Sequence, residues 1–368
     1  MIYFDNAATS FPKSGKVIKA ASDAMRKCGN PGRSGHAPAM RGAEAMFSCR
    51  EKAARIFGTE PERVILVPSC TAALNMAIKG YGKGKRIIIS NMEHNAVCRP
   101  AYAMRAAGEC EISFFNAFAK DAVSEFASKL GSSSVAAFSH GSNVCGKLLP
   151  LAGMLREARS RGVFTIIDAA QTAGHTAISF DQCDADIICC AGHKGLGGPT
   201  GTGLMLINRR VKELPRTILE GGTGVYSLDE WMPDFFPERL EPGTPGVAAF
   251  AGLSAALDEF TLEFDLSPFD LLCAELSYMK NVTLHGLCPR RERLPVLLFN
   301  VKGRSCEEVM RLLAARDICV RSGFHCAPLA HRALGTLSGG VRVSLGRENT
   351  KKEIKRFCYE LKKIASSV

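Results

Sequence analysis

Two short stretches of the sequence contain side chains that could do covalent chemistry. In the first, an apolar run leads into a glycine-rich turn that contains Lys194. A lysine that is desolvated and close to other cationic groups can lose its proton near neutral pH, and its amine then attacks carbonyl groups. In the second stretch, residues 320–328, a glycine-containing loop places Cys326 beside His325 and near Arg321. Neighbouring positive charge favours the thiolate, so this stretch predicts a nucleophilic cysteine.

Each stretch also has an ordinary interpretation. A single lysine among glycines is more often a surface residue, and a cysteine next to a histidine is common. The chemical interpretation is favoured because further polar residues follow apolar strands in the same way. These residues are Thr71, His94, Asn143, Asp168, Gln171 and His193. The carboxyl ends of parallel strands meet at one edge of a doubly wound sheet, so the pattern predicts one site at that edge.

Apolar runs separated by helical segments supply the strands that would position these residues. The expected strands cover residues 64–67, 86–90, 134–139, 163–167, 187–191 and 203–207. Thr71 is expected to cap a helix over 72–79, and a helix N-terminus after a strand can also hold a phosphate on its backbone amides. Asp168 is costly to bury unless it is paired. Arg342, on a predicted strand over 341–344, suits a two-point grip on a carboxylate.

The chain is long enough for two domains. We expect a large domain over residues 16–246, in which strands and helices alternate as in an α/β fold with a doubly wound, mostly parallel sheet. After residue 207 the sequence becomes irregular, and a helical segment at 247–260 is expected to mark the passage to a second domain. The small domain would combine residues 1–15 and 247–368 in an α+β arrangement and would carry the cysteine loop.

Composition argues against several classes of protein. The chain has 15 cysteines but no CxxC pair, which argues against a disulfide framework and against a structural zinc or other metal site. The formal net charge is +11, yet the basic residues are scattered without interleaved aromatic residues, which argues against nucleic-acid binding. No apolar run is long enough to span a membrane, and the start of the chain lacks a secretory signal, so we expect a cytoplasmic protein.

Six motifs stand in the order found in class V aminotransferase-fold enzymes. They occupy residues 5–8, 93–95, 168–171, 192–194, 242–245 and 321–327. More narrowly, the sequence resembles the cysteine desulfurase and selenocysteine lyase family, and its short cysteine loop is similar to that of the SufS-like, type II group. The resemblance implies the type I fold of pyridoxal phosphate-dependent transferases, pyridoxal 5'-phosphate as the cofactor, and a homodimer.

The resemblance also implies a role for individual residues. The catalytic residues would be Lys194, Cys326 and His94. The residues that bind the cofactor would be Thr71, Ala72, His94, Asn143, Asp168, Gln171, His193, Lys194 and, toward the neighbouring subunit, Thr244. The substrate would be bound by Arg342, Arg321, Ala8, His36 and Asn143. Lys194 matches the Schiff-base lysine, His94 the histidine that stacks on the pyridine ring, and Asp168 the acid that pairs with the pyridinium nitrogen.

The implied reaction converts L-cysteine to L-alanine, leaves a persulfide on Cys326 and passes the sulfur to an acceptor protein. Three alternatives stay open. They are a selenocysteine lyase that acts on L-selenocysteine, a class V aminotransferase or β-lyase in which Cys326 is a bystander, and a scaffold built on an inactive enzyme fold. The intact set of Lys194, Asp168 and Arg342 argues against the scaffold.

Three positions depart from the family pattern. Ala191 stands where the family often has serine, Cys70 replaces a usual threonine, and Phe324 replaces a usual histidine. One or two contacts to the phosphate of the cofactor are therefore expected to be lost, which would weaken cofactor binding without changing the chemistry.

Overall fold

Apolar strands form the sheet of the larger unit of the molecule, because strands that are covered by helices on both faces must be apolar along their whole length. In the computed structural model, which describes residues 1–32 and 34–366, seven strands pair in the order β2-β8-β7-β6-β5-β3-β4. The strands are β2 (Val64–Val67), β3 (Arg86–Ser90), β4 (Glu111–Phe115), β5 (Ser134–Ser139), β6 (Phe164–Asp168), β7 (Ile187–Ala191) and β8 (Gly203–Ile207). Within this set β8 alone runs in the direction opposite to the other strands, so the carboxyl ends of the others meet at one edge. The predicted doubly wound, mostly parallel sheet is confirmed.

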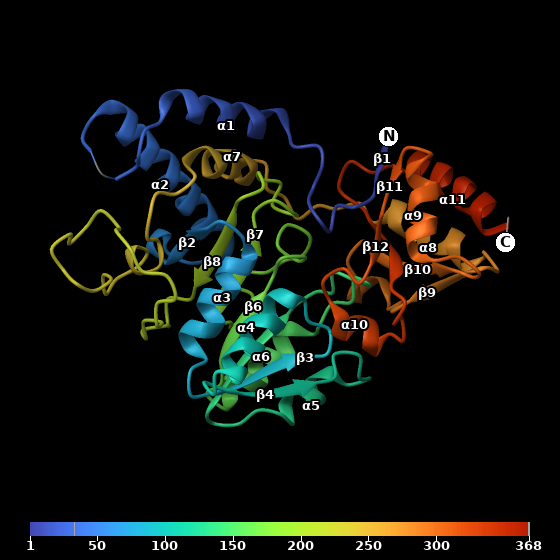
Figure 1. The fold of residues 1–368 in the computed structure, drawn as a ribbon, viewed down its shortest axis with the longest axis horizontal. Helices are drawn as coiled ribbons and strands as arrows, with labels where there is room; N and C mark the ends of the chain where they lie inside the picture. Colours follow the sequence, from blue (N-terminus) through green and yellow to red (C-terminus); the bar gives the residue numbers. More distant parts are fainter. Residues whose placement is uncertain (33, 367–368) are drawn as a thin grey trace.

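Helices cover both faces of this sheet and create two separate cores (Figure 1). One face is covered by α2 (Ala37–Phe57), α5 (Ala122–Ala127), α6 (Leu151–Ser160) and α7 (Val247–Asp258), and α1 (Gly15–Lys27) packs outside α2 and α7. The other face is covered by α3 (Cys70–Tyr81) and α4 (Asn95–Ala106), and the short helix η1 (Pro61–Arg63) leads into β2. None of the helices in the described part of the chain is long and apolar enough to cross a membrane.

The smaller unit is built on an antiparallel sheet with the strand order β12-β13-β10-β9. Its elements are α8 (Ser267–Ser277), β9 (Val282–His285), η3 (Arg290–Glu292), β10 (Val296–Val301), α9 (Cys306–Ala314), β12 (Arg321–Gly323), α10 (Pro328–Ala333), β13 (Gly340–Ser344) and α11 (Lys351–Ser366). β1 (Ile2–Tyr3) pairs in parallel with β11 (Ile318–Cys319), and Phe4 is buried in the same core as Phe357 of α11. The first residues of the chain therefore lie with this unit, as Figure 1 shows.

α7 packs with the larger unit, although its place in the sequence suggests the start of the small domain. It lies along α1 and α2, and its residues Phe250, Leu253 and Leu257 are buried in a core of the large sheet. A helix that follows a long irregular segment gives no sign in the sequence of the surface that it covers. We therefore propose that the boundary between the units lies at Glu259, where α7 ends, and not at residue 247.

Between β8 and α7 the chain forms an irregular arm, residues 208–246, that projects from the sheet (yellow in Figure 1) and includes η2 (Glu238–Leu240). Glu241 holds the base of this arm. Its half-buried carboxylate accepts hydrogen bonds from Arg50 Nη1 at 2.7 Å and from the Leu66 backbone N–H at 2.5 Å. The base of the arm is therefore fixed against β2, while its outer part is exposed.

Candidate active site

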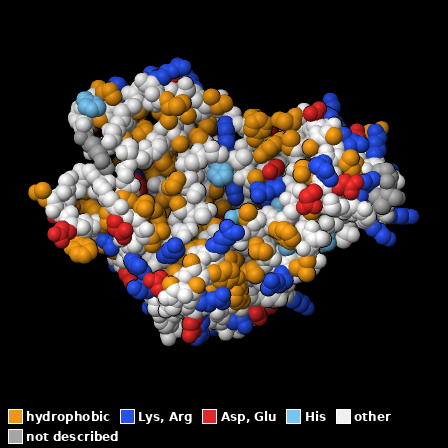
Figure 2. Space-filling model, viewed as in Figure 1, with side chains coloured by type: hydrophobic (Ala, Val, Ile, Leu, Met, Phe, Trp, Pro, Cys, Tyr) orange, Lys and Arg blue, Asp and Glu red, His pale blue; other side chains and the backbone are white. Residues whose placement is uncertain are grey.

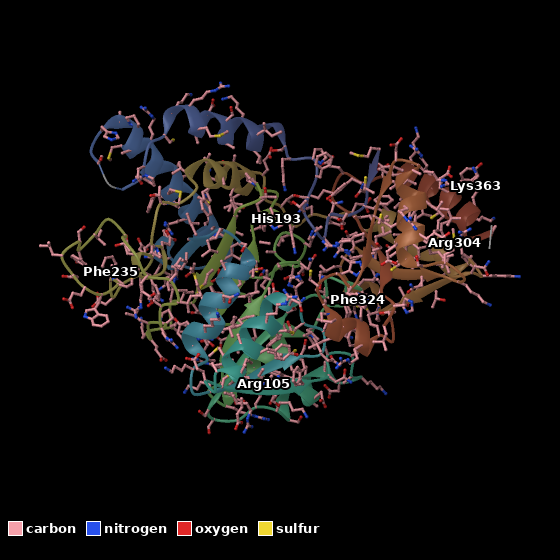
Figure 3. The ribbon with its side chains drawn as sticks, viewed as in Figure 1. Arg105, His193, Phe235, Arg304, Phe324 and Lys363 are labelled. Atoms are coloured by element: carbon pink, nitrogen blue, oxygen red, sulfur yellow. The ribbon has the colours of Figure 1, made fainter. Side chains whose placement is uncertain are left out.

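The polar residues that the sequence places after the strands line one cavity at the carboxyl edge of the large sheet. The cavity has a volume of about 80 Å³. Its lining includes Thr71, His94, Asn143, Asp168, Gln171, His193 and Lys194. Figure 3 places His193 in the region between the two units. Among the described residues, no group of three His, Cys, Asp or Glu side chains is placed to hold a metal ion.

Lys194 and Asp168 are the oppositely charged pair of this cavity. Asp168 ends β6 and Lys194 follows β7, so adjacent strands bring the two side chains to the same place. Burial lowers the pKa of the Lys194 amine, and the Asp168 carboxylate opposes this shift. The cations of Arg342 and Arg321 lower the pKa of the amine further. A larger fraction of the Lys194 amine is therefore neutral than at an exposed lysine with an ordinary pKa.

His94 presents a neutral ring in a fixed orientation. It is the N-cap of α4, and its Nδ1 accepts a hydrogen bond from the Ala96 backbone N–H at 3.0 Å. Burial lowers the pKa of this ring, so the ring carries a single proton, and the contact to Ala96 assigns that proton to Nε2. A flat, neutral ring of this kind can stack on a planar cofactor.

The N-terminus of α3 also lies at the cavity. The helix begins at Cys70, and Ser69 is its N-cap, because the Ser69 Oγ accepts a hydrogen bond from the Ala72 backbone N–H at 3.2 Å. The prediction that Thr71 caps this helix is wrong, since Ser69 has the extended backbone that a cap requires. The backbone N–H of Ala72, a residue that the resemblance assigns to cofactor binding, is therefore already bonded to the Ser69 side chain. The amides left for a ligand are those of Cys70 and Thr71.

His193 supplies a further group that suits a phosphate. Its Nδ1 is buried and has no hydrogen-bond partner among the described residues. Burial lowers the pKa of this ring to about 4, so the ring is neutral and keeps one N–H to donate. Its carbonyl is fixed by Thr9 Oγ1 at 3.1 Å and by Lys13 Nζ at 2.8 Å. Together with the N-terminus of α3, this unpartnered ring atom fits a phosphate-bearing group.

Arg342 lies at the contact between the two units and is almost completely buried, with 1% of its surface exposed. Its Nη1 donates to the Asn143 carbonyl at 3.0 Å, and its Nη2 donates to the Asp5 carboxylate at 2.5 Å. Its Nε is buried and has no partner among the described residues. Arg321 stands opposite Arg342 in the pairing of β12 with β13. The two arginines predicted to bind a carboxylate therefore come together, and the Nε of Arg342 is a nitrogen without a partner among the described residues.

Cys326 lies in an exposed turn between β12 and α10. His325 and Cys326 have positive φ angles of 52° and 56°, a conformation that residues other than glycine rarely adopt. Two hydrogen bonds from the larger unit hold this turn. The Asn95 backbone N–H donates to the Cys326 carbonyl at 2.7 Å, and Asn143 Nδ2 donates to the His325 carbonyl at 2.7 Å. The cysteine is therefore kept at the rim of the cavity, beside the first turn of α4.

His325 does not supply the positive charge that its place next to Cys326 suggests. Burial lowers the pKa of its ring to about 3, so the ring is neutral. It stacks on His331, and His325 Nδ1 lies 3.1 Å from His331 Nε2. His331 in turn contacts Thr336 Oγ1 at 2.8 Å. The structure thus gives His325 the role of a buried brace for the cysteine turn, instead of the predicted electrostatic one.

Seven predicted site residues are not in the lining of the cavity: Ala72, Cys326, Arg321 and Arg342, described above, and Ala8, His36 and Thr244. His36 is exposed and caps α2, with its Nδ1 accepting from the Ala39 backbone N–H at 3.3 Å. Thr244 is exposed on the arm. Ala8 is half-buried next to Ala7, whose carbonyl accepts a hydrogen bond from Gln171 Nε2 at 3.0 Å. Ala8 therefore lies near the cavity, whereas nothing in one chain brings His36 or Thr244 to it.

Three further residues support the site, although no pattern in the sequence assigns them a role of their own. Asp5 pairs with Arg342, Asn95 holds the cysteine turn, and Glu93 joins two strands. Each of them lies within a motif that the sequence displays. Their partners come from distant segments, so only the folded chain shows what they do.

Glu93, which immediately precedes His94 in the sequence, is a fully buried carboxyl group. Its oxygens accept hydrogen bonds from the Ser90 hydroxyl, from the Ser139 hydroxyl at 2.7 Å and from the Ser139 backbone N–H at 2.9 Å. These bonds tie the carboxyl ends of β3 and β5 together. Burial raises the pKa of Glu93 to about 7, and the hydrogen bonds from Ser90 and Ser139 only partly offset it.

Comparisons with known proteins identify the class. The chain belongs to the class V aminotransferase family, whose model matches residues 2–357. A probable cysteine desulfurase of Xylella fastidiosa is 29% identical, over 99% of this chain and 91% of that protein. The apo structure of a cysteine desulfurase from Thermococcus onnurineus NA1 has a TM-score of 0.91 and 25% identity, covering 100% of this chain and 95% of that one. The cysteine desulfurase CsdA of Escherichia coli has a TM-score of 0.88 and 27% identity, with the same coverage.

The substitution Glu93→Gln tests the buried carboxyl group. Because its folded pKa of about 7 lies above the ordinary 4.5, its contribution to stability is fully present below pH 4.5 and is lost as the pH rises toward 7. Urea unfolding across this interval should show the free energy of unfolding of the wild type falling by up to about 3 kcal/mol relative to the variant. The same pH dependence in both proteins would contradict this account of Glu93.

Proposed function

We propose that this chain is a pyridoxal phosphate-dependent cysteine desulfurase, which converts L-cysteine to L-alanine and receives the sulfur as a persulfide on Cys326. One observation carries the proposal. The turn that holds the exposed Cys326 is hydrogen-bonded through Asn95 and Asn143 to the rim of the cavity that contains Lys194. A thiol and a lysine of lowered pKa are thereby kept at one site. The names of similar relatives and solved structures support the same activity.

Pyridoxal phosphate suits the groups of this cavity. Lys194 would bind it covalently, Asp168 would pair with its ring nitrogen, and His94 would cover its ring. Its phosphate would lie at the N-terminus of α3, near Thr71 and His193, where backbone amides and a neutral imidazole can donate. When bound, the cofactor supplies an electron sink for the electron pair released at the substrate Cα.

Arginine and lysine side chains would handle the substrate. Arg342 would bind the substrate carboxylate with N–H groups of its guanidinium that Asn143 and Asp5 do not use, and Arg321 adds positive charge beside it. Holding the carboxylate fixes the direction of the Cα–H and Cβ–S bonds. The Lys194 amine is neutral more readily because burial lowers its pKa, and it would act as the base that removes the Cα proton.

Cys326 would attack the sulfur of the substrate. A bond forms between the two sulfur atoms while the substrate Cβ–S bond breaks, and the electron pair of that bond stays with the carbon fragment. Two protons complete alanine, one at Cβ and one back at Cα: Lys194 returns the proton that it took from Cα, and the proton that Cys326 gave up on becoming a thiolate is the second, while Cys326 keeps the sulfur as a persulfide. Because Cys326 is exposed, an external thiol can then collect the sulfur.

The surface around Cys326 suits an acceptor that carries acidic and apolar groups. Phe324 is 49% exposed, beside α10 on the side that faces the larger unit (Figure 3). Arg332 on α10 and Arg99, one helical turn after Asn95 on α4, are exposed, and neither forms an ion pair with a described carboxylate. Unpaired positive charge attracts negatively charged partners over a distance. The acceptor is therefore expected to be a protein with an acidic docking face.

A second copy of the chain would cover apolar side chains that one copy exposes. On α1, Ile18 and Met25 are 60% and 72% exposed, and on the arm, Leu228 and Trp231 are 99% and 84% exposed. Figure 2 shows hydrophobic side chains gathered on the part of the surface where α1, α2 and the arm lie. Large exposed apolar patches mark interaction surfaces. A homodimer would bury this patch and would also give Thr244 of the arm a neighbouring cavity to reach.

The cysteines suit a reducing compartment. All 15 of them are free, and most are buried. The proposed reaction also requires Cys326 as a free thiol. We therefore place the chain in the cytoplasm, where thiols are kept reduced.

The substitution Cys326→Ala should lower cysteine-dependent alanine formation at least about 100-fold, because the attacking sulfur is lost. Mass analysis of the wild type after incubation with L-cysteine should find one added sulfur on the peptide that contains Cys326. Cys110→Ala is the matched control, since this thiol precedes β4 at the opposite end of the sheet. Wild-type rates of alanine and sulfide formation in Cys326→Ala would remove Cys326 from the mechanism.

A charge reversal at the rim tests the acidic-acceptor proposal. With the persulfide formed, the rate of sulfur removal is measured with mercaptosuccinate, an anionic thiol, and with cysteamine, a cationic one. The double variant Arg99→Glu and Arg332→Glu should shift the ratio of these rates toward cysteamine by about threefold to tenfold at low salt. Arg156→Glu, an exposed change on α6 on the other face of the sheet, should leave the ratio unchanged. An unchanged ratio in the double variant would contradict the proposal.

A further inference from the structure

The cavity contains a second cysteine, Cys70, which touches the carboxylate of Asp168. Both residues line the cavity, and both are buried, with 8% and 6% of their surfaces exposed. The Cys70 thiol donates a hydrogen bond to Asp168 Oδ1 across a sulfur–oxygen distance of 3.6 Å. A thiol is a weak donor, but an ionised acceptor strengthens the bond, and burial removes competing water.

Two donors bind the same oxygen of Asp168, and together they fix the rotation of its carboxylate. The Ala170 backbone N–H donates to Asp168 Oδ1 at 2.9 Å. No donor among the described residues binds Oδ2, although Asp168 lines the cavity. With Oδ1 held from two sides, the carboxylate has one preferred rotation, and Oδ2 is the oxygen left for a ligand.

Cys70 is suited to donate and not to react. Burial raises the pKa of its thiol well above the ordinary value, and the negative charge of Asp168 raises it further. The thiol therefore stays protonated over the working pH range. Cys326, by contrast, is exposed. The two cysteines at the site thus have separate tasks, since the nucleophile must be a thiolate and the donor must keep its proton.

We propose that Cys70 is a positioning residue, whose thiol fixes the Asp168 carboxylate so that Oδ2 faces the ring nitrogen of the cofactor. This inference rests on the proposed cofactor. It assigns a role to a residue that departs from the family pattern, because Cys70 occupies a position where the family usually has threonine. The difference at residue 70 then affects the contacts near the pyridine ring of the cofactor and not the contacts to its phosphate.

The hydrogen bond itself can be measured in the full-length chain without cofactor. The S–H stretching band lies in a region of the infrared spectrum that other protein groups leave clear, and the Cys70 band is isolated by subtracting the spectrum of Cys70→Ala. Substituting Asp168→Asn replaces an ionised acceptor with a neutral one. The Cys70 band should then move to higher frequency, because the hydrogen bond is weaker. A Cys70 band that does not respond to Asp168→Asn overturns the proposal.

The positioning role is tested by the dissociation constant of pyridoxal phosphate and by the pH midpoint of the absorbance change of the bound cofactor. Cys70→Ala should raise the dissociation constant about tenfold and shift the midpoint, because one of two bonds to Oδ1 is lost. Cys70→Ser, which keeps a donor, should restore both values to within about twofold of the wild type. Cys189→Ala is the matched control for cavity formation, since Cys189 is fully buried and pairs with Asp168 in the register of β6 and β7.

Equal effects of Cys70→Ala and Cys189→Ala on both measurements would assign Cys70 to packing alone and overturn the proposal. These measurements do not depend on turnover. A chain that binds the cofactor as expected but forms no alanine from L-cysteine would refute the proposed function and leave the positioning role intact. A chain that desulfurates cysteine, but whose Cys70 band does not respond to Asp168→Asn, would refute the positioning role and leave the proposed function intact.

Discussion

The site depends on the burial of opposite charges at one edge of a parallel sheet. β6 and β7 are apolar and covered on both faces, so Asp168 at the end of β6 is buried by the fold itself, and Lys194 beyond the end of β7 is half-buried. Either charge alone would be costly in this position. Burial lowers the pKa of the Lys194 amine while Asp168 opposes the shift, and this balance leaves an amine that can act as both nucleophile and base. The contacts that hold Asp168 therefore matter as much as the lysine does.

A second constraint joins the two units. Asn143 belongs to the larger unit, yet its carbonyl binds Arg342 and its side-chain amide binds the carbonyl of His325. The proposed carboxylate clamp and the cysteine turn thus share one partner at the cavity, Asn143, and the Asn95 backbone N–H holds the turn as well. Because Arg342 and Cys326 both belong to the smaller unit, any movement of that unit would carry the substrate clamp and the nucleophile together.

Much of this arrangement could be predicted from local patterns in the sequence. Lys194, Asp168 and His94 each follow an apolar strand, and the carboxyl edge of a parallel sheet collects such residues. Which side chain bonds to which backbone group could not be predicted in this way. Ser69 and Thr71 are both good caps, and the backbone torsions of the folded chain decide between them.

The same limit applies to properties that arise only when segments pack together. The charge of His325 could not be predicted, because it depends on burial beside His331, and the place of α7 depends on the surface that it covers. The roles of His36 and Thr244 remain predictions, because a single chain does not bring either residue to the cavity.

The most direct test of the central claim is to find which lysine the cofactor binds. The full-length chain is saturated with pyridoxal phosphate, reduced with borohydride, digested and mapped by mass spectrometry. The account predicts one pyridoxyl phosphate group, on the peptide that contains Lys194. Labelling of Lys13 instead, a half-buried lysine whose pKa burial lowers to about 8, or the absence of any fixed label, would contradict it.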